Sequence, residues 1–287
     1  ANRTNTENGY HMIGASAVWS PEGEKLAESE LIDRKEKALD APTILYGRID
    51  PAKYENRSKR RLAERRPELY KELMLSKAPW DDTKKSVSRN VRAAVVQYEP
   101  VLANKEANLA KIRRLIDEAA ARAAEKGGLD LLVLPELSLT GTVDHLGAEQ
   151  IWALSDPMDG GWVRKMLDMA AAYGIHLVFG LIEREGERLY NSAILAGPQG
   201  EILGKYRKTH LHDADKPWAT PGEKIDVFHT ETIGDVGLMI GYDAAFPEIA
   251  GVLAVKRADI IVIPSSWRGE FGRFLESSLA EKKYPPG

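Results

Sequence analysis

Residues 236–248 read Val236-Gly-Leu-Met-Ile-Gly-Tyr-Asp-Ala-Ala-Phe-Pro-Glu248, and this stretch decides the fold class of the chain. Its first five residues are apolar and predict a short buried strand, which a turn with Tyr242 and Asp243 follows. Enzymes with α/β folds usually place their chemistry at the carboxyl end of such a strand. Gly241 stands at that position, and it offers no side chain.

The composition predicts an ordinary globular protein. The chain has 287 residues, of which 43% are hydrophobic, enough for one or two sizeable cores. Its 40 basic and 43 acidic residues nearly balance, so we expect neither a nucleic acid nor a membrane as partner. The basic run of residues 53–66 fits a solvated helix face better than a binding patch. We expect no signal peptide and no membrane span, because no apolar run reaches about 18 residues.

Cysteine is absent from the chain. Its absence excludes disulfides and thiolate metal sites and fits a cytoplasmic protein.

Apolar strands alternate with amphipathic helices from residue 91 onward. We expect strands at 91–99, 129–134, 175–183, 189–195, 202–206, 236–240 and 260–264, and helices at 104–125 and 162–173. Residues 197–200, Gly-Pro-Gln-Gly, predict the turn of a hairpin. Near-continuous apolar strands are typical of sheets that are covered on both faces, so the pattern indicates a layered α/β fold.

Three motifs in this order carry a resemblance to a known family. Leu132-Val-Leu-Pro-Glu136 and Tyr206-Arg-Lys-Thr-His-Leu211 precede the stretch of residues 236–248. Together they resemble the nitrilase superfamily of carbon–nitrogen hydrolases. The resemblance implies the four-layer α-β-β-α sandwich of that superfamily. It also implies a Glu, a Lys and a Cys as catalytic residues, which map onto Glu136, Lys208 and Gly241, so the thiol is missing.

In the family, Glu deprotonates the thiol, and the thiolate attacks an amide carbonyl or a nitrile carbon. Lys and a backbone N–H beside the nucleophile stabilise the developing charge, a role that maps here onto Lys208 and the Tyr242 N–H. Water activated by Glu then releases the acid, and neither a metal nor an organic cofactor is implied. Taken alone, Glu136 could be a capping or salt-bridging carboxylate and Lys208 part of a solvated strand end. The order of the two motifs, with the stretch of residues 236–248 downstream, favours the catalytic interpretation.

Further residues receive roles of lesser weight. The resemblance places Asp215 where a second acidic residue positions substrate, and it places Ser265, Ser266 and Trp267 along the substrate pocket. Tyr242 belongs to the same binding group. Asp243 should point away from the site, and Glu248 should secure the start of a helix.

His210 and His212 share one face of a strand, which raises the question of a zinc site. Zinc needs further ligands, and only two aspartates stand nearby in the sequence. We favour a Thr-His-Leu turn that is typical of the family, so no metal is expected.

The order of the pieces is unusual. Residues 1–78 resemble the closing portion of a nitrilase-like domain, residues 79–90 suit a linker, and residues 91–287 resemble the N-terminal and central portion that carries the site. A tandem protein or a circular permutation explains this order. We favour completion of one core, in which Val18 and Ile44 are buried against the strands that begin at 91 and 129.

The sequence therefore predicts hydrolysis of a carbon–nitrogen bond in a small amide, carbamoyl compound or nitrile. An amidase or carbamoylase is favoured, because Tyr242-Asp243 resembles those branches. The expected assembly is a homodimer or larger homo-oligomer. Because Gly241, whether natural or engineered, replaces the thiol, we expect the chain to be inactive as written. The alternative is a non-catalytic domain, derived from such a hydrolase, that binds a ligand or acts as a scaffold.

Overall fold

The computed structural model describes residues 6–7, 10–11, 15–21, 23–29, 44–53, 57–75 and 90–267. The chain divides into two units, residues 1–64 and residues 65–287. Most of the expected linker, residues 79–89, lies outside the described residues. Residues 65–75 belong to the larger unit, so the division falls before the expected linker. The assignment of residues 1–78 to a closing portion stays a prediction.

The smaller unit contains short elements. They are β1 (Thr6–Glu7), β2 (Tyr10–His11), β3 (Ala17–Trp19), β4 (Lys25–Glu28), the 3₁₀ helix η1 (Pro51–Lys53) and α1 (Arg57–Glu64). β1 pairs with β2 and β3 with β4, both antiparallel. Residues 44–50 have no regular secondary structure. Ile44 is 71% exposed and Val18 is half-buried within this unit, and their packing against the strands of the larger unit stays a prediction.

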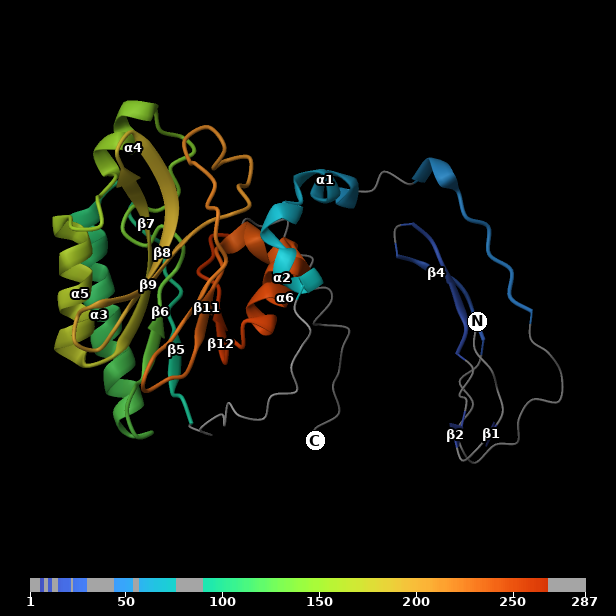
Figure 1. Cartoon of the computed structure of the whole chain (residues 1–287), viewed down its shortest axis with the longest axis horizontal. Helices are drawn as coiled ribbons and strands as arrows, with labels where there is room; N and C mark the ends of the chain where they lie inside the picture. The colour runs from blue at the N-terminus through green and yellow to red at the C-terminus, as the bar shows by residue number, and fades with distance from the viewer. Residues whose placement is uncertain are drawn as a thin grey trace. The chain divides into compact units, whose positions relative to one another are not determined.

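The larger unit contains two sheets and their covering helices (Figure 1). Its helices are η2 (Pro67–Leu69), α2 (Lys71–Leu75), α3 (Lys105–Ala124), α4 (Ala148–Leu154), α5 (Gly161–Tyr173), η3 (Gly241–Ala245) and α6 (Pro247–Val255). Its strands are β5 (Ala93–Val95), β6 (Leu131–Val133), β7 (His176–Glu185), β8 (Arg188–Ala196), β9 (Ile202–Arg207), β10 (Val227–Phe228), β11 (Val236–Leu238) and β12 (Ile260–Val262). The expected strands and helices of this unit are present, with boundaries that differ by a few residues.

The first sheet has the order β5-β6-β7-β8-β9. β5, β6 and β7 are parallel, and β7, β8 and β9 are antiparallel. The second sheet has the order β10-β11-β12, with β11 and β12 parallel. The parallel strands β6 and β11 therefore each deliver the following loop to the carboxyl edge of a sheet, where Glu136 and Gly241 lie.

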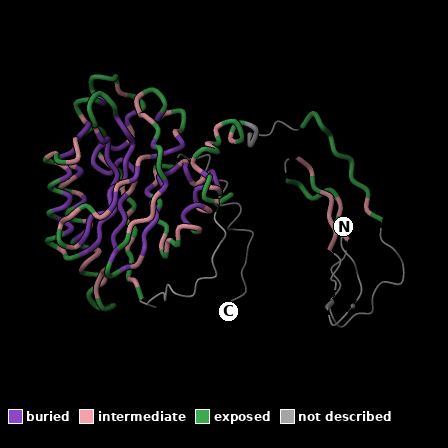
Figure 2. Tube along the Cα trace, in the orientation of Figure 1, coloured by how far each residue is buried: buried purple, intermediate pink, exposed green. Residues whose placement is uncertain are grey.

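Three apolar clusters separate four layers. Ile112 of α3 and Met166 of α5 pack on the first sheet, and a second cluster with Leu131 and Leu238 fills the space between the two sheets. The third cluster lies between the second sheet and α6 and includes Ile249 of α6. The layers are thus α3 and α5, the first sheet, the second sheet, and α6 with α2, as Figures 1 and 2 show. This is the expected α-β-β-α sandwich.

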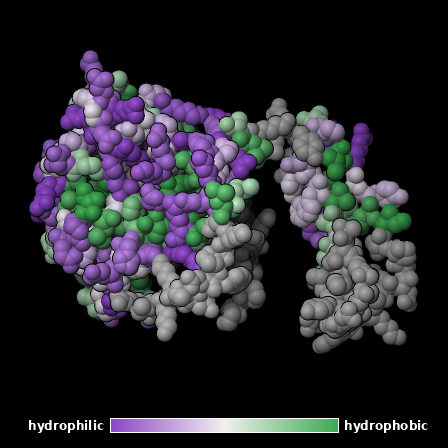
Figure 3. Space-filling view, in the orientation of Figure 1, coloured by the Kyte–Doolittle hydropathy of each residue, from purple (hydrophilic) through white to green (hydrophobic). Residues whose placement is uncertain are grey.

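The visible surface of the larger unit is mainly hydrophilic. Figure 3 shows hydrophilic side chains over most of the visible face of the larger unit, with apolar side chains between them. In the part of the chain that is described, no helix is both long and apolar enough to cross a membrane.

Candidate functional site

Glu136 stands three residues beyond Val133, the last residue of the buried strand β6. Its side chain is nearly buried, with a residue exposure of 8%. The carboxylate accepts hydrogen bonds at both oxygens. Oε1 accepts from Lys208 Nζ at 2.8 Å and Asn191 Nδ2 at 2.8 Å, and Oε2 accepts from the backbone N–H of Ser266 at 2.9 Å. Three donors from three different segments therefore fix this carboxylate.

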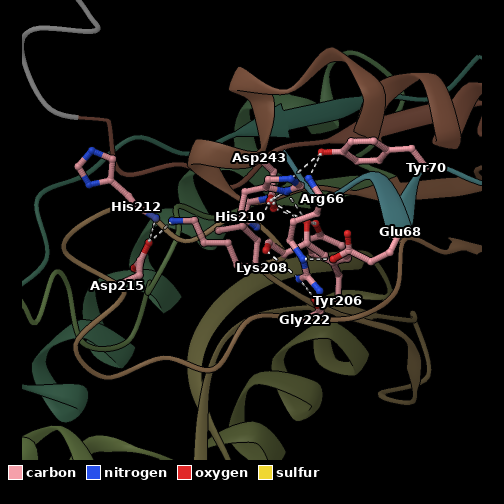
Figure 4. Close-up of polar contacts among 12 residues, drawn as sticks. Arg66, Glu68, Tyr70, Tyr206, Lys208, His210, His212, Asp215, Gly222 and Asp243 are labelled. Atoms are coloured by element: carbon pink, nitrogen blue, oxygen red, sulfur yellow. Dashed lines mark hydrogen bonds and ion pairs between the residues drawn. The ribbon is translucent and has the colours of Figure 1, made fainter. Parts of the chain in front are cut away.

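Lys208 follows the last residue of β9, and its backbone N–H donates to Asn191 O of the neighbouring strand at 2.8 Å. Its side chain is 3% exposed. The ammonium contacts Glu136 Oε1 and also Asp215 Oδ2, the latter at 2.6 Å. Figure 4 shows Lys208 and Asp215 side by side, with His212 next to them. The structure thus brings Glu136, Lys208 and Asp215 into contact.

The charge of Lys208 depends on its two acidic neighbours. Burial on its own lowers the pKa of Lys208, because a buried ammonium loses its hydration. The charges of Glu136 and Asp215, and their hydrogen bonds to Nζ, act in the opposite direction and leave the pKa above the ordinary value of 10.5. Lys208 is therefore a cation at neutral pH.

Gly241 begins the turn η3 directly beside Glu136. Its φ angle is +43°, in the left-handed region that side chains disfavour. Its backbone N–H donates to Pro264 O at 2.9 Å, which ties the turn to the end of β12. A Cβ atom on Gly241 would lie 2.7 Å from Glu136 Oε2. The carboxylate thus occupies the space where a side chain at this position would begin.

Asp243 faces away from this cluster and holds the turn in place. It is fully buried and accepts four hydrogen bonds. Oδ1 accepts from Thr209 Oγ1 at 3.0 Å and from the His210 N–H at 2.9 Å. Oδ2 accepts from the Tyr206 hydroxyl at 2.9 Å and from the Ile240 N–H at 3.0 Å. Asp243 therefore joins the end of β9 to the turn that carries Gly241.

A segment far away in the sequence supports the same turn (Figure 4). The Tyr70 hydroxyl and His210 Nε2 are 2.7 Å apart, and the His210 ring stacks on Phe246 with 4.0 Å between ring centres. Arg66 donates from Nη1 to Thr209 O at 3.2 Å. Desolvation raises the pKa of Tyr70, so its hydroxyl stays protonated and can donate. Residues 65–75 are thus part of the architecture around the cluster.

The remaining predicted residues lie nearby without joining the ion pairs. Tyr242 is half-buried, and its ring meets His212 edge to face, with the centres 5.2 Å apart. The Ser265 hydroxyl donates to Ile263 O at 3.0 Å, within its own segment, and Trp267 is 43% exposed. As expected, Glu248 lies in the first turn of α6 and pairs with Arg65.

His210 and His212 do not converge on a shared ligand position. The His210 ring is engaged with Tyr70 and Thr209, whereas the His212 ring lies against Tyr242. Among the described residues, no group of three His, Asp or Glu side chains is arranged to hold a metal ion.

One member of the cluster, Asn191, was not predicted. Asn191 of β8 is 1% exposed, and its Nδ2 bridges Glu136 Oε1 and Asp215 Oδ1 at 2.8 and 3.2 Å. The sequence did offer one indication of a buried polar site here, because Asn191 and Ser192 are polar residues within an otherwise apolar strand. Ser266 was expected along the pocket, but the hydrogen bond from its backbone N–H to Glu136 could not be predicted, because any residue offers a backbone donor.

A polar cavity of about 410 Å³ is lined in part by residues of β9. Its lining is largely charged and consists of Glu185, Arg188, Tyr190, Lys205, Tyr206, Arg207, Thr220, Pro221, Gly222, Glu223, Lys224 and Asp226. Neither Glu136 nor Lys208 lines it. The geometry of the ion pairs, rather than this cavity, therefore defines the candidate site.

Comparison with known proteins identifies a family and several relatives of similar sequence. The sequence profile of the family described as carbon-nitrogen hydrolase matches residues 92–273. A nitrilase of Pyrococcus abyssi is 37% identical over 61% of this chain and 65% of the relative. An (R)-stereoselective amidase of a Pseudomonas species is 32% identical over 51% of this chain and 52% of the relative. A citrullinase of Francisella tularensis is 32% identical over 62% of both. The match spans less than two thirds of the length of these relatives.

Solved structures of similar fold come from the nitrilase superfamily. Nit3 of Saccharomyces cerevisiae, a member of branch 10 of the nitrilase superfamily, is 26% identical with a TM-score of 0.55, over 64% of this chain and 67% of that chain. A variant of the amidase of Nesterenkonia sp. AN1 is 30% identical with a TM-score of 0.53, over 67% of this chain and 71% of that chain. In that amidase, acrylamide has added to the active-site cysteine.

Proposed function

The chain belongs to the carbon-nitrogen hydrolase family, and we propose that Glu136, Lys208 and Asp215 form its site for a small amide, carbamoyl compound or nitrile. In this proposal Glu136 is the general base, and Lys208 with the Tyr242 N–H stabilises the negative charge that develops on the reacting group. Asp215 positions Lys208. Gly241 occupies the position of the nucleophile and supplies none.

One observation carries the proposal. The direction in which Gly241 would project a side chain leads to Glu136 Oε2, with 2.7 Å between the Cβ position and that oxygen. A base and its nucleophile must lie within hydrogen-bond reach of each other. The position next to the base is thus the position that lacks a side chain.

The missing side chain has a chemical consequence. Without a nucleophile no acyl-enzyme forms, and in a protease triad such a loss costs roughly a millionfold in kcat. The charged and polar groups remain, so the chain should bind an amide and turn it over poorly or not at all. This also supports the second candidate function, a non-catalytic ligand-binding or scaffolding domain.

Small amides and carbamoyl compounds are the favoured ligands. Among the relatives, one is named an amidase and another a citrullinase. The Tyr242-Asp243 pair is the feature of this chain that favours the amidase and carbamoylase branches. A nitrile remains the less favoured ligand class.

The test restores the nucleophile. Gly241→Cys is incubated with an activated ester, and intact mass spectrometry follows formation of the thioester adduct. We expect an adduct in Gly241→Cys and none in Gly241→Ala, which carries the same Cβ without a thiol. The Glu136 carboxylate ends a flexible side chain, so it can move aside for the new Cβ.

The role of Glu136 is tested in the same background. Adding Glu136→Gln to Gly241→Cys should abolish the thioester, because the thiol loses its base. Acrylamide, which adds to the cysteine of the Nesterenkonia amidase, reports whether the new thiol is accessible in both proteins. An accessible thiol that forms no thioester with Glu136 intact would contradict the proposed function.

We further propose that the protein is a cytoplasmic homodimer or larger homo-oligomer, and that residues 1–78 are the closing portion of a nitrilase-like domain. A tandem protein and a circular permutation both account for that order. Limited proteolysis within residues 79–90 separates them, because fragments that stay associated after cleavage support one shared core. Light scattering of the intact chain measures the oligomeric state.

A further inference from the structure

We propose that Asn191 is a further ligand-binding residue of the cluster, and that its side-chain carbonyl selects a ligand with a terminal N–H donor over an ester or a nitrile. The ligand class is therefore a carboxamide or a carbamoyl compound. The inference rests on the proposed function, because it assigns the ligand of the same site.

The orientation of the Asn191 amide is fixed by its neighbours. Nδ2 donates to Glu136 Oε1 at 2.8 Å and to Asp215 Oδ1 at 3.2 Å. Both partners are carboxylate oxygens, which accept hydrogen bonds when they are ionised. Rotating the amide by half a turn would direct Oδ1 at two acceptors. The NH₂ group must therefore face the carboxylates, and Oδ1 must face the other way.

Asn191 Oδ1 is left without a partner. The residue is 1% exposed, and this oxygen is buried with no hydrogen bond within the described part of the chain. Buried side-chain oxygens normally have a partner, so each exception calls for an explanation. Asn108, also buried, shows the usual case. Its Nδ2 donates to Val101 O and Leu139 O, and its Oδ1 accepts from the Val101 N–H at 2.7 Å.

The position of this oxygen suits the nitrogen of a ligand. Oδ1 and Nδ2 are bonded to the same carbon, so the unpaired acceptor belongs to the same cluster, although it points away from the Glu136 and Asp215 oxygens that Nδ2 contacts. In the proposed site, Glu136 returns a proton to the departing nitrogen and must therefore lie near it. An N–H of a carboxamide at that place can donate to Oδ1. The lone pairs of an ester oxygen or a nitrile nitrogen would meet Oδ1 acceptor to acceptor.

The experiment compares ligands that differ in this one group. The native chain, which we expect not to turn them over, is titrated with propionamide, methyl propionate and propionitrile by calorimetry or ligand-observed NMR. We expect propionamide to bind about 5- to 150-fold more tightly than methyl propionate, the range that an unpaired buried acceptor implies. In Asn191→Leu this ratio should fall to about one.

Two results would overturn the inference. The ester could bind the native chain as tightly as the amide, or the preference for the amide could survive in Asn191→Leu. The first comparison uses the native chain only, so it holds even where the variant fails to fold. Asn108→Leu is the matched control, since it removes a buried asparagine outside the cluster and should leave the ratio unchanged.

Lys208→Met separates this inference from the proposed function. If amide and ester bind equally and both lose affinity in Lys208→Met, the site stands and only the role of Asn191 is wrong. If neither ligand binds the native chain, or if the affinity of both ligands is unchanged in Lys208→Met, the proposed function and the inference fail together.

Discussion

Replacing Gly241 by alanine should destabilise the larger unit by two separable effects. The first is backbone strain, because Gly241 has a φ angle of +43°. Placing a Cβ on a left-handed residue costs about 1–2 kcal/mol. The second is steric. The new Cβ would lie 2.7 Å from Glu136 Oε2, closer than the 3.0 Å that Cβ atoms keep. The carboxylate must move, and losing one charge-assisted hydrogen bond costs about 1.5–3 kcal/mol.

Gly186 provides the matched control for the first effect. Its φ angle is +57°, and a Cβ placed there would meet no atom within 4 Å. Gly186→Ala should therefore cost about 1–2 kcal/mol of strain alone, and Gly241→Ala about 2.5–5 kcal/mol in all.

Thermal unfolding followed by tryptophan fluorescence measures both variants. For a unit of this size each kcal/mol lowers Tm by about 2–4 °C, so the two variants should differ by at least about 3 °C. Equal losses in Gly186→Ala and Gly241→Ala would refute the placement of Glu136 beside residue 241.

Three further outcomes follow from buried polar groups. Lys208→Met leaves two carboxylates without their cation and should cost about 3–5 kcal/mol in urea unfolding, whereas Lys205→Met should cost less, because Arg207 also pairs with Glu183. Tyr70→Phe removes the contact to His210 and should cost about 1–3 kcal/mol, and an unchanged Tm would contradict this. Burial lowers the pKa of His176 below 6.5, so below that pH the unfolded chain binds a proton that the folded chain excludes, and stability falls. His176→Asn should flatten this acid-side loss, measured as Tm against pH.

The strands that deliver the site were predictable because their sequences are continuous and apolar. The runs at 131–133 and 236–238 are buried throughout. A short continuous apolar run of this kind is typical of a strand that is buried on both faces. Their boundaries were less predictable. The first strand was expected at 91–99, whereas β5 covers Ala93–Val95, because hydrogen bonding to the neighbouring β6 limits its length.

Glu136, Lys208 and Asp215 could be selected from their motifs, but their partners could not. The Asn191 bridge depends on the register of β8 against β9, which places Asn191 O opposite the Lys208 N–H. The contact of Tyr70 with His210 joins residues 140 positions apart, and no local pattern specifies such a pair. The Ser266 contact uses a backbone atom that every residue carries. Residue types thus indicated the chemistry, and tertiary packing supplied its support.

The most direct test of the central claim is the release of ammonia from a small carboxamide by the native chain, with Gly241→Cys and Glu136→Gln measured beside it. We predict no release above background by the native chain, because Glu136 has no nucleophile to activate. Rapid release by the native chain that Glu136→Gln abolishes would contradict the account, since Glu136 would then activate water or another nucleophile directly.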